Sequence, residues 1–121
     1  MRLILSLFFA PALAFAQAAF PTDWPADAQS LTADVLRQRL VGKTFLAKSL
    51  TGSDVRTEYK DAIVFINTGE TSDSGKWRTE GSSVCIEWKR LRAACSEVRA
   101  VGDVLYVKRA NNGEVMAMLP K

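Results

Sequence analysis

The sequence predicts a mainly β protein: a small antiparallel meander that closes into a barrel, with one short helix near its N-terminus. From residue 43 onward, short runs of β-favouring residues alternate with turn residues at near-regular spacing. A convincing helical pattern precedes them only once, and two cysteines are spaced to bridge neighbouring strands. Closing the meander into a barrel would remove its exposed edges. A two-sheet sandwich is the alternative arrangement.

Residues 1–16 have the pattern of a cleavable secretory signal. Arg2 gives a positively charged start, Leu3–Ala10 is apolar, and Ala14-Phe15-Ala16 offers the small-x-small motif before Gln17. This stretch is shorter than the roughly 20 residues that a membrane-spanning helix needs. We therefore expect cleavage before Gln17, an exported protein that is periplasmic or secreted, and no membrane span.

The chain that remains has the size of one domain. Removing residues 1–16 leaves 105 residues, which divide into an extended lead-in (17–30) and a single β-rich domain with one helix (31–121). It keeps 15 basic and 13 acidic residues, so the net charge falls from +3 to +2. A charge so near zero does not indicate a nucleic-acid binder.

The lead-in is interrupted by Pro21 and Pro25, and its large apolar side chains are Phe20 and Trp24. Trp24 either docks on the domain and ties the segment down, or forms an exposed aromatic contact for a partner. We expect docking, because an exposed tryptophan is uncommon.

The helix is expected from Ala33 to Val41. The hydroxyl of Thr32 is suited to accept a hydrogen bond from a free N–H of the first turn. Leu36 and Leu40 share one face, which should lie against the sheet, and Gly42 is suited to end the helix in the left-handed conformation.

Eight strands are expected after the helix. They are Thr44–Leu50, Val55–Tyr59, Ala62–Asn67, Lys76–Thr79, Val84–Trp88, Cys95–Ala100, Asp103–Arg109 and Glu114–Leu119. The unbroken apolar run from Ile63 to Ile66 predicts a strand covered on both faces. Turns are expected at Thr51–Asp54 and at Asn111-Asn112-Gly113, and a polar loop is expected from Thr68 to Gly75.

Cys85 and Cys95 are expected to form a disulfide. If the chain folds back about Arg90, the two cysteines face each other across antiparallel strands, on the more polar face. Val84 and Trp88 then point to the other face. Loop closure for so small a ring implies a stabilisation of about 2.5–3 kcal/mol. A redox role is disfavoured, because there is neither a Cys-x-x-Cys motif nor a nearby base.

Several structural residues carry a family resemblance. They follow the order Gly-x-Trp, Gly, Cys, Trp, Cys and are Gly75, Trp77, Gly81, Cys85, Trp88 and Cys95. With the segments 31–36 and 40–44, this order resembles a family of small secreted proteobacterial proteins catalogued only as a domain of unknown function. The resemblance covers most of residues 30–110. It implies a periplasmic β domain and carries over no catalytic residue.

The chain contains no histidine, which excludes Ser-His-Asp and Cys-His catalysis. Zinc ligation by cysteine and histidine is excluded as well if the cysteines are bridged. Carboxylates occur near turns, but no spacing brings two of them together: Glu58, Asp61, Glu70, Asp73 and Glu80. We therefore predict that the protein is not an enzyme and has no catalytic residue, metal or cofactor.

Two polar segments are candidate contact sites. The first is a basic hairpin that would contact an anionic partner such as a glycan, a lipid headgroup or an acidic protein patch: Lys89, Arg90, Arg92 and Arg99. The second is a partner loop: Glu70, Ser72 and Asp73.

Three function classes follow from these features. The first prediction is a small non-catalytic binding or interaction module that recognises an envelope protein or glycan. The first alternative is a small barrel that carries an apolar ligand. A contiguous cavity would favour the carrier, whereas a centre filled by Phe45, Phe65, Trp77 and Trp88 would count against it. The second alternative is an inhibitor of a hydrolase that acts through residues 68–75.

Overall fold

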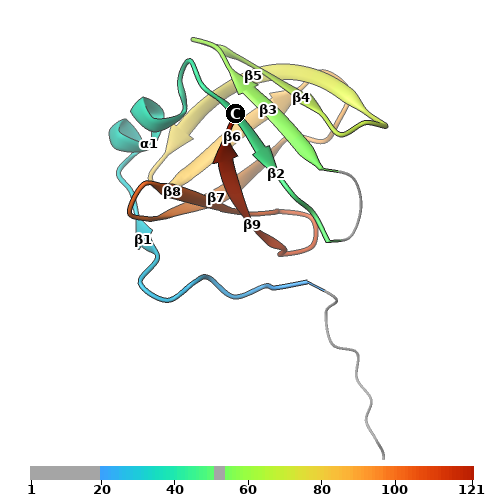
Figure 1. The fold of residues 1–121 in the computed structure, drawn as a ribbon. Helices are drawn as coiled ribbons and strands as arrows, with labels where there is room; N and C mark the ends of the chain where they lie inside the picture. Colours follow the sequence, from blue (N-terminus) through green and yellow to red (C-terminus); the bar gives the residue numbers. More distant parts are fainter. Residues whose placement is uncertain (1–19, 51–53) are drawn as a thin grey trace, which may run out of the picture.

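Eight antiparallel strands close into a barrel, and a short helix and a ninth, two-residue strand lie outside the ring (Figure 1). This arrangement comes from a computed structural model, which describes residues 20–50 and 54–121. The elements in chain order are β1 (Gln29–Ser30), α1 (Ala33–Leu40), β2 (Thr44–Ala47), β3 (Val55–Tyr59), β4 (Ile63–Asn67), β5 (Ser72–Glu80), β6 (Ser83–Trp88), β7 (Ala94–Val101), β8 (Val104–Lys108) and β9 (Val115–Pro120).

The ring is an up-and-down meander. Each strand from β2 to β9 pairs with the next one along the chain, and β9 pairs with β2, placing Met118 opposite Ala47. The predicted barrel is confirmed, and the sandwich is not formed. Because the strands alternate in direction, the loops fall at two ends. Short connections at 60–62, 81–82 and 102–103 lie at one end, with α1. Longer loops at 68–71, 89–93 and 109–114 lie at the other end, where β2 ends and β3 begins.

Helix α1 closes the end with the short connections. Leu36 and Leu40 are fully buried in a cluster to which every one of the eight ring strands contributes a side chain. The hydroxyl of Thr32 accepts a hydrogen bond from the backbone N–H of Val35 at 3.3 Å, as the predicted N-cap requires. The helix ends at Leu40, one residue earlier than predicted, and Gly42 follows in the left-handed region with φ +77°.

Side chains alternate between the inside and the outside of the barrel wall. On β4, Val64 is fully buried inside, whereas Phe65 points outward and is 44% exposed. The prediction that the run from Ile63 to Ile66 is covered on both faces was therefore wrong, as was the placement of Phe65 in the interior. The reason is that a barrel wall is a single layer with one face to solvent, and no element packs on the outside of β4 among the described residues.

The polar loop predicted at 68–75 is shorter than expected. Strand β5 already begins at Ser72, because the segment 72–74 pairs with β4, placing Asp73 opposite Ile66. The turn between these strands comprises residues 68–71. Strand β2 ends at Ala47 rather than at Leu50. Most of the predicted turn at 51–54, and the whole predicted secretory signal, lie outside the described residues.

The lead-in runs along the outside of the barrel, from the end with the longer loops towards the end with α1 (Figure 1). The carbonyl of Pro21 accepts a hydrogen bond from the N–H of Val115 at 2.9 Å, and β1 pairs with β7. Between these two points, Trp24 lies under two cations, with the Arg99 guanidinium 4.6 Å and the Lys108 ammonium 5.2 Å from its ring centroid. The predicted docking of Trp24 on the domain is confirmed.

The predicted disulfide is present. Cys85 on β6 lies directly opposite Cys95 on β7, with Cα atoms 3.9 Å apart, and the bridge lies on the outer face of the wall. Among the described residues there is no helix with the length and apolar composition needed to cross a bilayer.

Candidate functional site: the barrel cavity

The interior of the barrel contains a cavity of about 660 Å³, next to the end with the longer loops. It exists because the inward positions around it include small side chains, Ala47 on β2 and Ala94 on β7. The other apolar side chains of its wall are Phe45, Val55, Tyr59, Ile66, Val84, Ile86, Trp88, Leu91, Val107, Ala110, Met116 and Met118. Eight-stranded barrels have an interior just wide enough to be filled by side chains or to hold one small ligand. This barrel leaves the space open.

An aromatic cluster forms the floor of the cavity. The rings of Phe45 and Tyr59 have centroids 6.2 Å apart, and those of Tyr59 and Trp77 are 5.0 Å apart, both in edge-to-face arrangement. The indole N–H of Trp77 donates to the carbonyl of Lys60 at 2.9 Å, which fixes the ring. Burial raises the pKa of the Tyr59 phenol far above its ordinary value, despite a hydrogen bond with Thr57 that lowers it. The floor is therefore aromatic, and its phenol is uncharged at neutral pH.

Six polar side chains interrupt the apolar wall. They are Thr57, Thr68, Arg92, Ser96, Arg109 and Asn111. Thr57 and Ser96 lie within strands β3 and β7, whereas the other four belong to the loops at the open end or border them. The charged and amide side chains are thus at the mouth, together with Thr68, whereas the hydroxyls of Thr57 and Ser96 lie farther in.

Glu114 is a buried acid beside the mouth. Its side chain is 1% exposed, and its carboxylate accepts hydrogen bonds from the Ser49 hydroxyl at 3.1 Å and from the Leu50 N–H at 3.0 Å. The Arg109 guanidinium lies 3.6 Å away. These contacts compensate the carboxylate, as burial of a charge requires. They also hold the β2–β3 loop against the β8–β9 turn and fix Arg109 at the cavity mouth.

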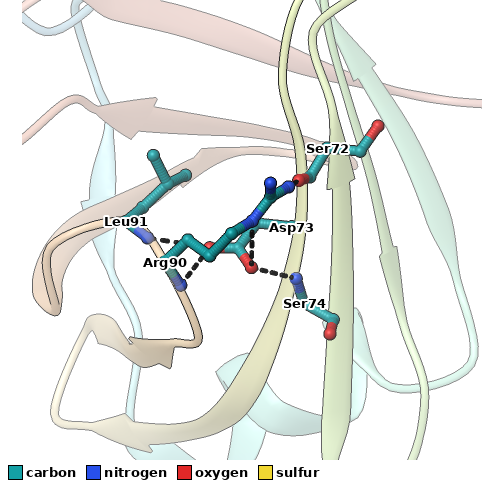
Figure 2. A network of polar contacts seen from close by, with 5 residues as sticks. All are labelled: Ser72, Asp73, Ser74, Arg90 and Leu91. Atoms are coloured by element: carbon teal, nitrogen blue, oxygen red, sulfur yellow. Dashed lines mark hydrogen bonds and ion pairs between the residues drawn. The ribbon is translucent and has the colours of Figure 1, made fainter.

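The two predicted contact segments meet each other in the structure (Figure 2). The Asp73 carboxylate accepts hydrogen bonds from the backbone N–H groups of Arg90 at 3.0 Å, Leu91 at 2.9 Å and Ser74 at 2.8 Å. The Arg90 guanidinium donates to the carbonyl of Ser72 and lies 3.9 Å from the Asp73 carboxylate. With its side chain 2% exposed, Asp73 organises the β6–β7 turn and offers no free surface to a partner.

The remaining predicted contact residues lie apart from one another. Arg99 is on β7, further along the strand that follows the turn, and its guanidinium donates to Glu97 at 2.8 Å. Glu70 and Ser72 are exposed. Lys89 borders a shallow outer hollow beside Phe65, outside the barrel. Of the predicted site residues, Arg92 is the one that the structure places at the cavity.

Three of the five carboxylates that were considered for catalysis are held in separate ion pairs. Glu58 lies 3.2 Å from Lys60, Asp61 lies 3.0 Å from Arg37, and Glu80 lies 2.6 Å from Arg78. In the described part of the chain, no three cysteine or carboxylate side chains gather as a metal site would require.

The network around Asp73 predicts a pH-dependent stability. Burial alone would raise the pKa of this carboxyl, but the N–H donors of Leu91, Arg90 and Ser74, together with the Arg90 charge, outweigh it and hold the pKa below its ordinary value. A lowered folded-state pKa means that the ionised group stabilises the fold above its unfolded pKa, about 3.9, and that this contribution disappears as the pH falls through the folded-state pKa.

We expect Asp73→Asn to unfold at lower urea concentration than the wild type at pH 7, because the amide offers one oxygen where the carboxylate offers two. The difference should narrow as the pH is lowered below about 4. Asp61→Asn is the control: its side chain is 94% exposed, and its ion pair with Arg37 should contribute little at either pH. A difference between Asp73→Asn and the wild type that stays constant with pH would contradict the role of the carboxylate charge.

Much of the cavity was not assigned to a ligand site from the sequence. Arg109 and Asn111 were interpreted as parts of a strand and a turn, and Met116 and Met118 as ordinary strand residues. Strand alternation offered one available signal: Leu105 and Val107 share the inner face of β8, and Arg109, the next position in this alternation, directly follows the strand. The chain matches no family model, no curated protein and no solved structure, so the geometry described above is the basis for inferring its function.

Proposed function

We propose that this protein binds a small apolar molecule inside its barrel and acts as its carrier. The observation that supports this function is the contiguous cavity of about 660 Å³, which lies within the range of about 300–1,000 Å³ typical of ligand pockets. Its wall is mostly apolar, with a few polar groups at the mouth. That combination is typical of sites that bury the body of a ligand and orient one end of it.

The same observation favours the carrier over an interaction module based on the basic hairpin. Trp88 lies on the cavity wall, and Trp77 packs against Tyr59 without lining the cavity, so these two aromatic side chains leave the interior open. Arg90 and Arg99 are engaged in contacts within the chain, with Ser72 and Asp73 in one case and with Glu97 and Trp24 in the other. We therefore rank the cavity above the outer surface as the place of function.

The test is to fill the cavity from its wall. Ala94 lines the cavity, and its neighbour Ala93 is exposed in the turn before β7 and does not line it. We expect Ala94→Phe to weaken binding of N-phenylnaphthylamine, a neutral fluorescent apolar probe, at least about tenfold, because the new ring occupies ligand volume. Ala93→Phe makes the same change of side chain outside the cavity and should bind the probe as the wild type does.

Binding is measured by titrating the probe and following its fluorescence, and thermal unfolding of both variants shows that each is folded. Failure of the wild type to bind any apolar probe would remove the proposed function. Equal binding by wild type, Ala93→Phe and Ala94→Phe would place the probe outside the barrel and would contradict the cavity as its site.

A further inference from the structure

The charges of the cavity wall have one sign. Two arginines, Arg92 and Arg109, line the cavity, and none of the described residues lining it is an aspartate or glutamate. Both arginines lie at the open end: Arg92 belongs to the β6–β7 turn, and Arg109 directly follows β8. The opposite end is the aromatic floor. The cavity is therefore polarised along its length, apolar at the bottom and cationic at the mouth.

The two arginines differ in what compensates their charge. The Arg109 guanidinium lies 3.6 Å from the buried carboxylate of Glu114, which neutralises it locally. Within residues 20–50 and 54–121, no acidic side chain forms an ion pair with Arg92, and no hydrogen bond from its guanidinium is present. Arg92 thus supplies the net positive charge of the mouth, and Arg109 adds donors in a fixed position.

Asp73, the acid that contacts the β6–β7 turn, is already bound by groups other than Arg92. The Asp73 carboxylate is bound by the N–H groups of Arg90 and Leu91 and lies near the Arg90 guanidinium. It does not line the cavity. The charge of Arg92 is consequently available to a ligand.

From this polarity we infer that the ligand is an amphiphile with one anionic group, whose apolar body fills the barrel and whose carboxylate or phosphate meets Arg92 and Arg109 at the mouth. The inference rests on the proposed function and specifies its ligand class. A guanidinium presents several donors in one plane, which suits the oxygens of either anion. A cationic amphiphile would place its charge against Arg92 and be repelled.

The test compares probes that share one apolar chain and differ in the head. Laurate and dodecyl phosphate carry an anionic head, dodecanol a neutral one and dodecylammonium a cationic one. Each is titrated against the full chain carrying bound N-phenylnaphthylamine, and displacement of the probe gives its affinity. We expect laurate or dodecyl phosphate to bind about tenfold more tightly than dodecanol, and dodecylammonium to bind most weakly. The anion that binds more tightly identifies the head group as carboxylate or phosphate.

A matched pair of variants assigns the preference to Arg92. Arg92→Gln should lower the affinity for the preferred anion about five- to tenfold, the modest size reflecting a side chain that is exposed to solvent, and should leave dodecanol unchanged. Lys89→Gln removes the same charge from the same turn, but Lys89 does not line the cavity. It should change the affinity for no probe by more than about twofold.

The outcomes separate the two proposals. If dodecanol and the anions bind alike, and Arg92→Gln changes neither, the ligand is apolar without an anionic head, and the inference fails while the carrier stands. If Lys89→Gln weakens the anions as much as Arg92→Gln does, the effect comes from the overall charge of the turn, and the inference fails as well. If neither N-phenylnaphthylamine nor any of the four dodecyl probes binds the wild type, the proposed carrier function itself fails.

Discussion

Replacing Gly75 with alanine is expected to destabilise the fold by about 3 kcal/mol or more, the upper end of what overpacking costs. Gly75 lies on β5 between Val64 of β4 and Trp88 of β6. A Cβ at this position would lie 2.3 Å from the carbonyl oxygen of Glu87 and 2.8 Å from the Cα of Trp88. Both atoms belong to the backbone of the neighbouring strand, so no side-chain rotation relieves the contact.

Gly81→Ala is the matched control. Gly81 has a positive φ of +55°, and a Cβ there would meet nothing within 4 Å, so its substitution carries a backbone cost of about 1–2 kcal/mol without a clash. Urea unfolding of both variants, followed by circular dichroism, gives the comparison. If Gly75→Ala lowers the free energy of unfolding no more than Gly81→Ala does, β5 and β6 separate easily at this point and the expected clash is absent.

The close approach at Gly75 also bears on the cavity. Trp88 lines the cavity, and its backbone is the part of β6 that passes nearest to Gly75. A strand displaced to admit a methyl group would carry Trp88 with it. We therefore expect the folded fraction of Gly75→Ala to bind an apolar probe more weakly than the wild type, whereas Gly81→Ala, remote from the cavity wall, should bind normally.

Features set by neighbours along the chain were predictable from the sequence. The N-cap at Thr32 and the buried face of α1 follow from residues within one or two helical turns. Alternation along the segments around Cys85 and Cys95 predicted the bridge between these two residues. It also predicted that Val84 and Trp88 share a face, which is the inner face of the barrel. The meander and its closure followed from the number and spacing of the strands.

Features that depend on distant contacts were not predictable in the same way. The polar start of β5 has the composition of a loop, and it becomes a strand because β4 pairs along it. The role of Asp73 depends on Arg90 and Leu91, which lie 17 and 18 residues further along the chain. The run around Phe65 has no alternation, so it did not reveal which of its residues face solvent.

The cavity is a property of the closed ring as a whole. Its volume depends on how eight strands set the barrel width and on which inward positions carry small residues such as Ala47 and Ala94. Neither quantity is visible in any one segment. Arg92 was singled out by its charge alone. Its position at the cavity depends on the conformation of the β6–β7 turn, which is held by hydrogen bonds to Asp73 on β5.

Leu36→Ala is the second substitution with a large expected effect, a loss of about 2–5 kcal/mol in the free energy of unfolding. Leu36 is fully buried where α1 closes the barrel, in the cluster shared by all eight ring strands, and truncation leaves a void that this rigid ring fills poorly. Val35→Ala is the control, because Val35 is adjacent in the helix and 42% exposed; its change should stay within about 0.5 kcal/mol.

These two variants also distinguish stability from ligand binding. Leu36 lies beyond the aromatic floor and does not line the cavity, so its loss should lower the unfolding midpoint while the affinity of the folded protein for an apolar probe stays within about twofold of the wild type. Arg92→Gln should show the reverse, an unchanged unfolding midpoint with a weakened anionic probe. A Leu36→Ala protein that loses probe binding while still folded would mean that the closed end forms part of the ligand site.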